Sequence, residues 1–276
     1  MKAEAQDRGM LAALVQEAER RVAAARSGRR ELERRAAAAA QAPDFGAALA
    51  GGPAVAVIAE IKRKSPSAGA LWAGGDVAGL AGLLEGSGAR ALSVLTEPAH
   101  FGGSLDDLAR AAAAVRIPVL RKDFIIDPVQ LFEARANGAA AVLLIVRIVE
   151  PGRLADLAGA ARGLGLATLV EVRDPSELAA ALTAQPTAVG VNARDLDTLA
   201  MDRALVEALL ERIPADRVAV AESGLSLRAD VEAMARRGAD AVLVGAAIAG
   251  APDPAAALRP LTGVPRRRDA RQGGRP

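Results

Sequence analysis

The sequence predicts an α/β fold in which eight strand–helix units close into one barrel. Short apolar segments alternate with Ala- and Leu-rich helical stretches at a spacing of roughly 20 to 35 residues, as in right-handed βαβ units. The length of 276 residues is close to the roughly 250 residues of one eight-unit barrel, and 51% hydrophobic residues can form a large core. No G-x-G-x-x-G motif follows the first predicted strand, which disfavours an open dinucleotide-binding sheet. We therefore expect a (βα)8 TIM barrel with an N-terminal helical extension.

A helical pattern precedes the first strand. Residues 1–9 are predicted to be disordered, and apolar residues then recur at three- and four-residue steps as far as about Ala40. Ser27-Gly28 interrupts this pattern, so it predicts either one long helix or two shorter ones. A short helical segment at 45–49 follows. Because these helices stand outside the repeat, they form an extension over residues 10–50.

The strands are expected as short apolar runs that each end at a loop. Two of the following helices carry start signals, since Asp127-Pro128 and Asp174-Pro175 each place a capping side chain before an N1 proline. No linker divides the chain, so residues 10–262 are predicted to form one domain, followed by a basic disordered tail at 263–276. The predicted strands are 54–60, 91–96, 118–122, 141–146, 166–172, 188–192, 218–223 and 241–245.

Composition excludes several classes of function. The chain has no Cys, which excludes disulfides and thiolate sites, and one His, so we predict no metal site. Its net charge is only +2, and the arginines of the tail are expected to be solvated rather than bound to nucleic acid. No uninterrupted apolar run reaches the roughly 18 residues of a membrane span, and the N-terminus lacks a signal-peptide core. We therefore expect a cytoplasmic protein without nucleic-acid or membrane partners.

Polar side chains gather where the predicted strands end. Side chains alternate across a strand, so Glu60 and Lys62 lie on the same face as Ala56 and Ile58. Because Ala56 and Ile58 are apolar, this face is expected to pack in the core. In a closed barrel the carboxyl ends of all strands meet at one mouth, where active sites lie. A structural ion pair would explain one such residue, but several buried charges are costly without a function. Later strands end in Lys122, Glu171, Asn192, Arg194, Glu222, Ser223, Gly224 and Gly245.

These residue types indicate acid–base chemistry on a phosphorylated substrate. Crowded lysines and glutamates tune one another's pKa towards the working pH. Glycine turns after strands seven and eight, followed by a short predicted helix at 246–249, are typical of a barrel phosphate site. Phe101, Phe124 and Trp72 fall in the loops after the first three strands, which predicts an apolar ring in the substrate. For Trp72, plugging of the barrel top is an equal alternative.

Several motifs, in order, resemble the indole-3-glycerol phosphate synthase family. The resemblance runs from about Leu11 to Pro254, and the N-terminal helices are similar to that family's extension. It implies a cofactor-free enzyme of tryptophan biosynthesis that closes the ring of 1-(2-carboxyphenylamino)-1-deoxyribulose 5-phosphate, with loss of carbon dioxide and water. Transient contact with other tryptophan-pathway enzymes is compatible with it. The matching stretches are AEIKRKSPSAG, SVLTEPAHFGGSLDDL, PVLRKDFIIDPVQLFEARANGA, LLIV, LVEVRDPSEL, VGVNARDLDTL, VAESGL and LVG.

The same resemblance implies roles for the residues at the mouth. Lys122 resembles the general acid that assists attack on the carbonyl, and Glu171 resembles the general base or proton shuttle of dehydration. Glu60 would orient Lys122 and contact the substrate. Lys62 would meet the substrate's anionic groups and donate a later proton, and Asn192 would hold a hydroxyl or orient the acids.

The remaining residues implied by the resemblance contact the substrate. The family usually has a serine where this chain has Ala246, so backbone N–H groups would bind the phosphate there. The substrate-binding residues are Ser65, Phe101, Phe124, Arg194, Glu222 and Ser223. The phosphate-binding residues are Lys62, Gly224, Gly245 and Ala246.

Two other functions remain open at this point. One is a different phosphosugar barrel, such as phosphoribosylanthranilate isomerase, which would not explain lysines on both strands one and three. The other is a non-catalytic barrel that binds a phosphorylated metabolite, for which Lys122 and Glu171 together would be unnecessary.

Overall fold

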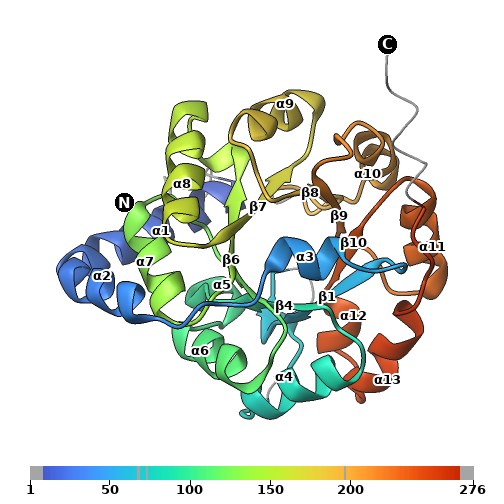
Figure 1. Ribbon diagram of the computed structural model, residues 1–276, viewed down its shortest axis with the longest axis horizontal. Coiled ribbons are helices and arrows are strands. Elements are labelled where there is room, and N and C mark those ends of the chain that lie inside the picture. The colour runs from blue at the N-terminus through green and yellow to red at the C-terminus, as the bar shows by residue number, and fades with distance from the viewer. Residues whose placement is uncertain (1–8, 67–68, 73, 196, 268–276) are drawn as a thin grey trace.

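Eight parallel strands form a closed barrel in the computed structural model, which describes residues 9–66, 69–72, 74–195 and 197–267 (Figure 1). Strand β1 pairs with both β4 and β10, and this pairing closes the sheet. The predicted barrel and all eight predicted strands are confirmed, and no strand end shifts by more than two residues. The strands are β1 (Ala56–Ile61), β4 (Ala91–Leu95), β5 (Val119–Lys122), β6 (Ala141–Ile145), β7 (Ala167–Val172), β8 (Ala188–Asn192), β9 (Val218–Glu222) and β10 (Ala241–Val244).

Helices follow the strands and surround the barrel. The predicted start of α7 is present as a full capping box between Asp127 and Gln130, and Asp174 caps α9 by accepting from two backbone N–H groups. The long helices are α4 (Val77–Gly86), α6 (Leu105–Ala114), α7 (Pro128–Ala136), α8 (Pro151–Gly163), α9 (Pro175–Thr183), α10 (Arg203–Leu210) and α11 (Arg228–Arg236). The shorter ones are α5 (Pro98–Phe101), α12 (Ala246–Ala249), α13 (Pro254–Leu258) and the 3-10 turns η1 (Val146–Ile148) and η2 (Arg259–Leu261).

The apolar residues form two cores, as the alternation of side chains in a barrel requires. One cluster lies between the strands and the outer helices and includes Val57, Val94 and Val170. The other fills the inside of the barrel and includes Ile58, Leu120 and similar inward side chains. The inner residues occupy every second position of a strand. The inward position two residues further towards the carboxyl end of each strand therefore faces the mouth.

The N-terminal extension closes both ends of the inner core. It consists of α1 (Met10–Arg26), α2 (Arg29–Ala38) and α3 (Phe45–Ala50), so the predicted interruption at Ser27-Gly28 separates two helices. Phe45 and Leu49 of α3 pack with the first inward residues of the strands, and Figure 1 shows α3 in front of that end. Leu14 and Ala18 of α1 are fully buried in the same cluster.

Helix α1 is fixed over the carboxyl ends of the strands by polar contacts along its length. The Asp197 carboxylate accepts a hydrogen bond from Leu11 N at 3.1 Å, near the first turn of the helix. In the middle, the Arg21 guanidinium makes two hydrogen bonds of 2.9 and 2.8 Å to Asp123. At the last residue, Arg26 pairs with Asp127 at 2.8 Å. The helix is therefore tied to loops that follow β5 and β8.

The loop after β1 contains a small hairpin that the sequence did not predict. Strand β2 (Lys64–Ser65) pairs antiparallel with β3 (Gly69–Ala70). Two residues per strand are too few to show an alternating pattern, so periodicity could not reveal them.

Residues 263–267, which the sequence assigns to the disordered tail, pack against the first strand. Val55 N donates to the carbonyl of Val264 at 2.8 Å, and Val264 is buried. Arg266 pairs with Asp240 at 2.9 Å and donates to the carbonyl of Ala50. The predicted disorder of residues 1–8 and 268–276 lies outside the described residues.

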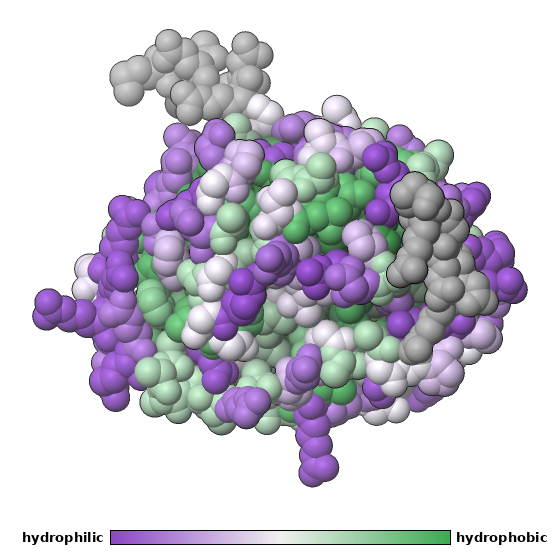
Figure 2. Space-filling model, turned by 45° about the horizontal axis from the view of Figure 1, so that its top comes forward, coloured by the Kyte–Doolittle hydropathy of each residue, from purple (hydrophilic) through white to green (hydrophobic). Residues whose placement is uncertain are grey.

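The surface carries few large apolar side chains. Figure 2 shows hydrophilic residues spread over one face, with apolar residues between them. In the described part of the chain, no helix is both long and apolar enough to span a membrane. The exposed large apolar residues among those described are Leu83, Met201 and Leu227.

Candidate active site

The carboxyl ends of the strands surround a cavity that is open at its mouth. Asn192 and Gly245 do not line the cavity but contact residues that do, namely Glu171 and Glu60. The other sequence-predicted site residues all line it: Glu60, Lys62, Ser65, Phe101, Lys122, Phe124, Glu171, Arg194, Glu222, Ser223, Gly224 and Ala246.

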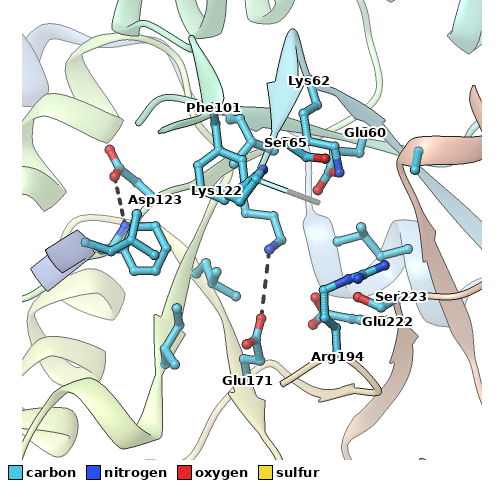
Figure 3. A pocket seen from close by; sticks show the side chains of 18 of the residues that line it. Glu60, Lys62, Ser65, Phe101, Lys122, Asp123, Glu171, Arg194, Glu222 and Ser223 are labelled. Carbon is cyan, nitrogen blue, oxygen red and sulfur yellow. Dashed lines mark hydrogen bonds and ion pairs between the residues drawn. The ribbon is translucent and has the colours of Figure 1, made fainter. Parts of the chain in front are cut away.

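Glu60 and Lys62 form the first ion pair of the cavity. The Lys62 Nζ atom lies 2.6 Å from Glu60 Oε1, and both side chains project from the end of β1 (Figure 3). Burial by itself raises the pKa of Glu60, but the charges of Lys62 and Lys122 outweigh it and lower that pKa. Glu60 is therefore a carboxylate at neutral pH.

Lys122 and Glu171 face each other across the cavity. The Lys122 ammonium lies 3.9 Å from Glu171 Oε2, and Figure 3 shows the two side chains pointing towards one another from β5 and β7. Burial alone lowers the pKa of Lys122, but Glu171, Glu222 and Glu60 together outweigh it and raise that pKa. Lys122 is therefore charged at neutral pH and can act as a proton donor.

Asn192 holds the Glu171 carboxylate in place. Its Nδ2 donates to Glu171 Oε1 at 3.0 Å, while its Oδ1 accepts from the Arg194 backbone N–H at 2.9 Å. Ser223 Oγ donates to the same Oδ1 at 2.8 Å. Because a backbone N–H can only donate, it fixes which end of the amide faces Glu171.

Glu222 lies at the end of β9 and is 1% exposed. Burial, followed by the charge of Glu171, raises the pKa of Glu222 to about 8, although Lys122 opposes the shift. Among the described residues, neither of its carboxyl oxygens has a hydrogen-bond partner. Its environment thus differs sharply from that of Glu171.

An apolar wall lies beside these charges. The rings of Phe101 and Phe124 are 6.3 Å apart and tilted by 33°, and both residues line the cavity. Trp72 is not among the lining residues. Its ring lies 5.0 Å from the Arg63 guanidinium and packs on the outer core. The wall is completed by Met10, Leu14, Leu95, Leu143, Ile145, Leu199 and Leu243.

Sequence reasoning missed Asp123, which lines the cavity between Lys122 and Phe124. Its carboxylate accepts from Arg21, from Arg121 at 3.0 Å and from Thr96 Oγ1 at 2.6 Å. Alternation along β5 places residue 123 on the face opposite Lys122, so the strand pattern gave no reason to select it. The only feature of the sequence that could have indicated Asp123 is its position directly after Lys122.

Met10 and Leu14 were also missed, because they come from the extension and not from a strand end. Their apolar side chains at a spacing of four residues fit any amphipathic helix. In the described ranges, no group of three or more His, Cys, Asp and Glu side chains is arranged to hold a metal ion.

Replacing Gly245 by Ala is expected to lower kcat/KM by at least about tenfold, because a small displacement of charged groups in an active site typically has effects of this size or larger. A Cβ atom at this position would lie 2.2 Å from Glu60 Oε1 and 3.0 Å from Lys62 Nζ, so the ion pair must move. Steady-state kinetics measure the loss. Gly82→Ala is a control, since its Cβ would meet nothing within 4 Å. Equal kinetics in both variants would contradict the close packing of Glu60 on residue 245.

The fold and the cavity define a class of protein. The cavity has paired lysines and glutamates at the carboxyl end of a closed barrel, beside an aromatic wall. This arrangement is typical of an acid–base enzyme that acts on a small anionic molecule.

Comparison with known proteins identifies the family. The sequence pattern of indole-3-glycerol phosphate synthase matches residues 11–261. The chain is 48% identical to indole-3-glycerol phosphate synthase 2 of Streptomyces coelicolor, over 92% of this chain and 99% of that protein. It is 47% identical to the Mycobacterium leprae enzyme of the same name, over 82% of this chain and 83% of the relative. The chain belongs to the indole-3-glycerol phosphate synthase family, as its motifs predicted.

Solved structures share the fold at low sequence identity. Orotidine 5'-phosphate decarboxylase from Pyrococcus horikoshii matches with a TM-score of 0.57 and 14% identity, over 79% of this chain and all of that chain. Thiamine phosphate pyrophosphorylase from Pyrococcus furiosus matches with a TM-score of 0.56 and 17% identity, over 74% of this chain and 92% of that chain. These likenesses concern the barrel alone.

Proposed function

We propose that this chain catalyses the indole-3-glycerol phosphate synthase reaction, the decarboxylating and dehydrating closure of 1-(2-carboxyphenylamino)-1-deoxyribulose 5-phosphate. The observation that carries the proposal is the Lys122–Glu171 pair, with its 3.9 Å separation, inside a cavity that also has an aromatic wall. A binding site for an anion needs a cation, but it does not need an opposed carboxylate held by an amide.

The aromatic ring and the anionic groups of the substrate each meet a complementary part of the cavity. The carboxyphenyl ring packs against Phe101 and Phe124. The phosphate lies at the glycine corner, where the backbone at Gly224 and Ala246 lines the cavity. Lys62, at the cavity wall, supplies positive charge for the anionic groups. Arg194 and Ser223 border the same corner.

Ring closure begins with a new carbon–carbon bond between the ring carbon that bears the carboxylate and the ketone carbon. Lys122 donates a proton to the ketone oxygen as this bond forms, which prevents build-up of an oxyanion. The bond to the carboxylate then breaks, carbon dioxide leaves, and the electron pair restores the aromatic ring. The negative charge of Glu171, and to a lesser extent that of Glu60, keeps the ammonium of Lys122 charged.

Dehydration follows in the same cavity. Lys62 donates a proton to the new hydroxyl, which leaves as water, and Glu171 removes a proton from the neighbouring carbon to complete the indole ring. Two protons are donated and one is recovered, so each turnover consumes one proton from solvent. Asn192 orients Glu171 for this step through its 3.0 Å hydrogen bond.

A turnover assay with the purified chain tests the proposal. Incubation with the carboxyphenylamino substrate is expected to produce indole fluorescence. Binding of the substrate without any product would favour a non-catalytic barrel. Turnover of phosphoribosylanthranilate in place of this substrate would favour the isomerase reaction.

A further inference from the structure

Two glutamates of the cavity have contrasting surroundings. Glu171 lies on β7 and Glu222 on β9, with β8 between them, and both face the cavity in Figure 3. Glu171 receives the Asn192 amide at 3.0 Å and the Lys122 ammonium at 3.9 Å. Within the described ranges, Glu222 has neither a hydrogen-bond donor nor a cation at ion-pair distance. Glu171 therefore has direct contacts that stabilise a negative charge, whereas Lys122 acts on Glu222 only from beyond ion-pair distance.

The carboxyl group of Glu222 occupies space that a side chain on β8 would otherwise fill. A Cβ atom on Gly190 would lie 1.9 Å from Glu222 Oε1 and 3.2 Å from Leu169 Cδ1. The group is thus seated against a bare backbone and an apolar side chain. An ionised carboxylate in such a place is costly, because nothing replaces the water it loses.

The charged groups around Glu222 also affect its protonation state. Lys62 and Glu60 from β1 neutralise each other at 2.6 Å, and Lys122 from β5 is paired with Glu171 from β7. Arg194, from the loop after β8, shares the cavity wall. With Glu222 ionised, the three carboxylates would balance Lys62, Lys122 and Arg194, so the free cavity would be neutral. An anionic substrate adds negative charge to the cavity, which favours the neutral form of Glu222.

We propose that Glu222 binds the substrate as a neutral carboxylic acid and donates a hydrogen bond to one of its oxygens, while Glu171 remains the carboxylate of the pair. The identity of the ligand rests on the proposed function, but the protonation of Glu222 does not. The raised pKa of Glu222 agrees with this assignment, since burial and the charge of Glu171 both favour its neutral form. An environment that keeps one of two neighbouring carboxyl groups neutral is a recurrent means of dividing acid and base roles.

Infrared difference spectroscopy tests the protonation without any ligand or turnover. Wild type minus Glu222→Gln, at about pH 6, is expected to show the C=O stretching band of a neutral carboxylic acid. The band should disappear as the pH is raised through the pKa of Glu222. A wild-type spectrum without this band would overturn the proposal, whether or not the protein is an active synthase.

Product binding tests the hydrogen bond. Between about pH 7 and 9, above the second ionisation of a phosphate, calorimetry would follow the affinity for indole-3-glycerol phosphate. The neutral form binds, so wild-type affinity is expected to fall by up to about tenfold per pH unit above the pKa of Glu222. Glu222→Gln, which cannot ionise, should bind several-fold more weakly at low pH and lose this fall.

Two variants complete the test. Glu232→Gln changes a half-exposed glutamate that pairs with Arg228 on α11, so the fall in affinity should be retained. Glu222→Ala removes the donor and should weaken product binding more than Glu222→Gln at every pH. Equal affinities in the Gln and Ala variants, or an unchanged pH dependence in Glu222→Gln, would refute the hydrogen bond.

Discussion

Replacing Lys122 by Ala is expected to lower kcat by at least about a hundredfold, the low end of the contribution of a general acid. The variant removes the ammonium that faces Glu171 at 3.9 Å, and Arg121, the other cation of β5, does not line the cavity and cannot replace it. The raised pKa of Lys122 means that the wild-type residue stays protonated throughout the neutral range, so the loss should not depend on pH there. Single-turnover kinetics with the carboxyphenylamino substrate measure the effect.

Lys64→Ala is the matched control for this experiment. Lys64 lies on the neighbouring hairpin, and its ammonium contacts only the carbonyl of Ala99, at 2.6 Å, among the described residues. Its removal is expected to change kcat by less than about threefold, since it offers no acid to the cavity. Near-normal turnover in Lys122→Ala would show that another group protonates the ketone.

Replacing Asp123 by Ala is expected to lower the free energy of unfolding by about 3–5 kcal/mol, as for other buried ion pairs that lose one partner. The carboxylate accepts from Arg21, Arg121 and Thr96, and the Arg121 side chain is itself 1% exposed. The Glu133 carboxylate, 3.0 Å from Arg121, would remain and limit the loss. Urea denaturation measures the change.

The pH dependence of this stabilisation follows from the sign of the pKa shift. Burial alone raises the pKa of Asp123, but Arg121 and Arg21 outweigh it and hold that pKa well below its usual value. The ion pairs therefore stabilise the fold fully above the ordinary aspartate range, and their contribution is lost only in strong acid. Asp106→Ala, which breaks an exposed pair with Arg110, should change stability by less than about 1 kcal/mol. A similar small change in Asp123→Ala would contradict the network.

The barrel and most of the cavity could be predicted because both follow from strand alternation. Once β1 is placed, residues 60 and 62 must lie on its inward face, and closure brings them opposite Lys122 and Glu171. The family motifs added Ser65, while Phe101 and the segment that begins with Ala246 were selected because they follow predicted strands. These three residues lie in a two-residue strand and two short helices, where alternation gives no guidance. Their positions at the cavity are confirmed, while their roles in binding stay predictions.

What could not be predicted depends on contacts between distant segments. Trp72 was expected at the mouth, yet Arg63 covers its ring, and no pattern reveals such a pairing. Asp123 was passed over because its partner Arg21 lies in the extension, about a hundred residues away in sequence. Met10 reaches the cavity only because α1 crosses the barrel mouth.

The seam between β10 and β1 has a consequence for the order of folding during synthesis. Val264 and Arg266 bind the backbone around β1 and α3, so the strand made first is fastened by residues that emerge from the ribosome last among those described. Contacts so far apart in sequence form slowly. A growing chain can therefore assemble consecutive strand pairs, but its ring of strands is locked only after Arg266 has been translated.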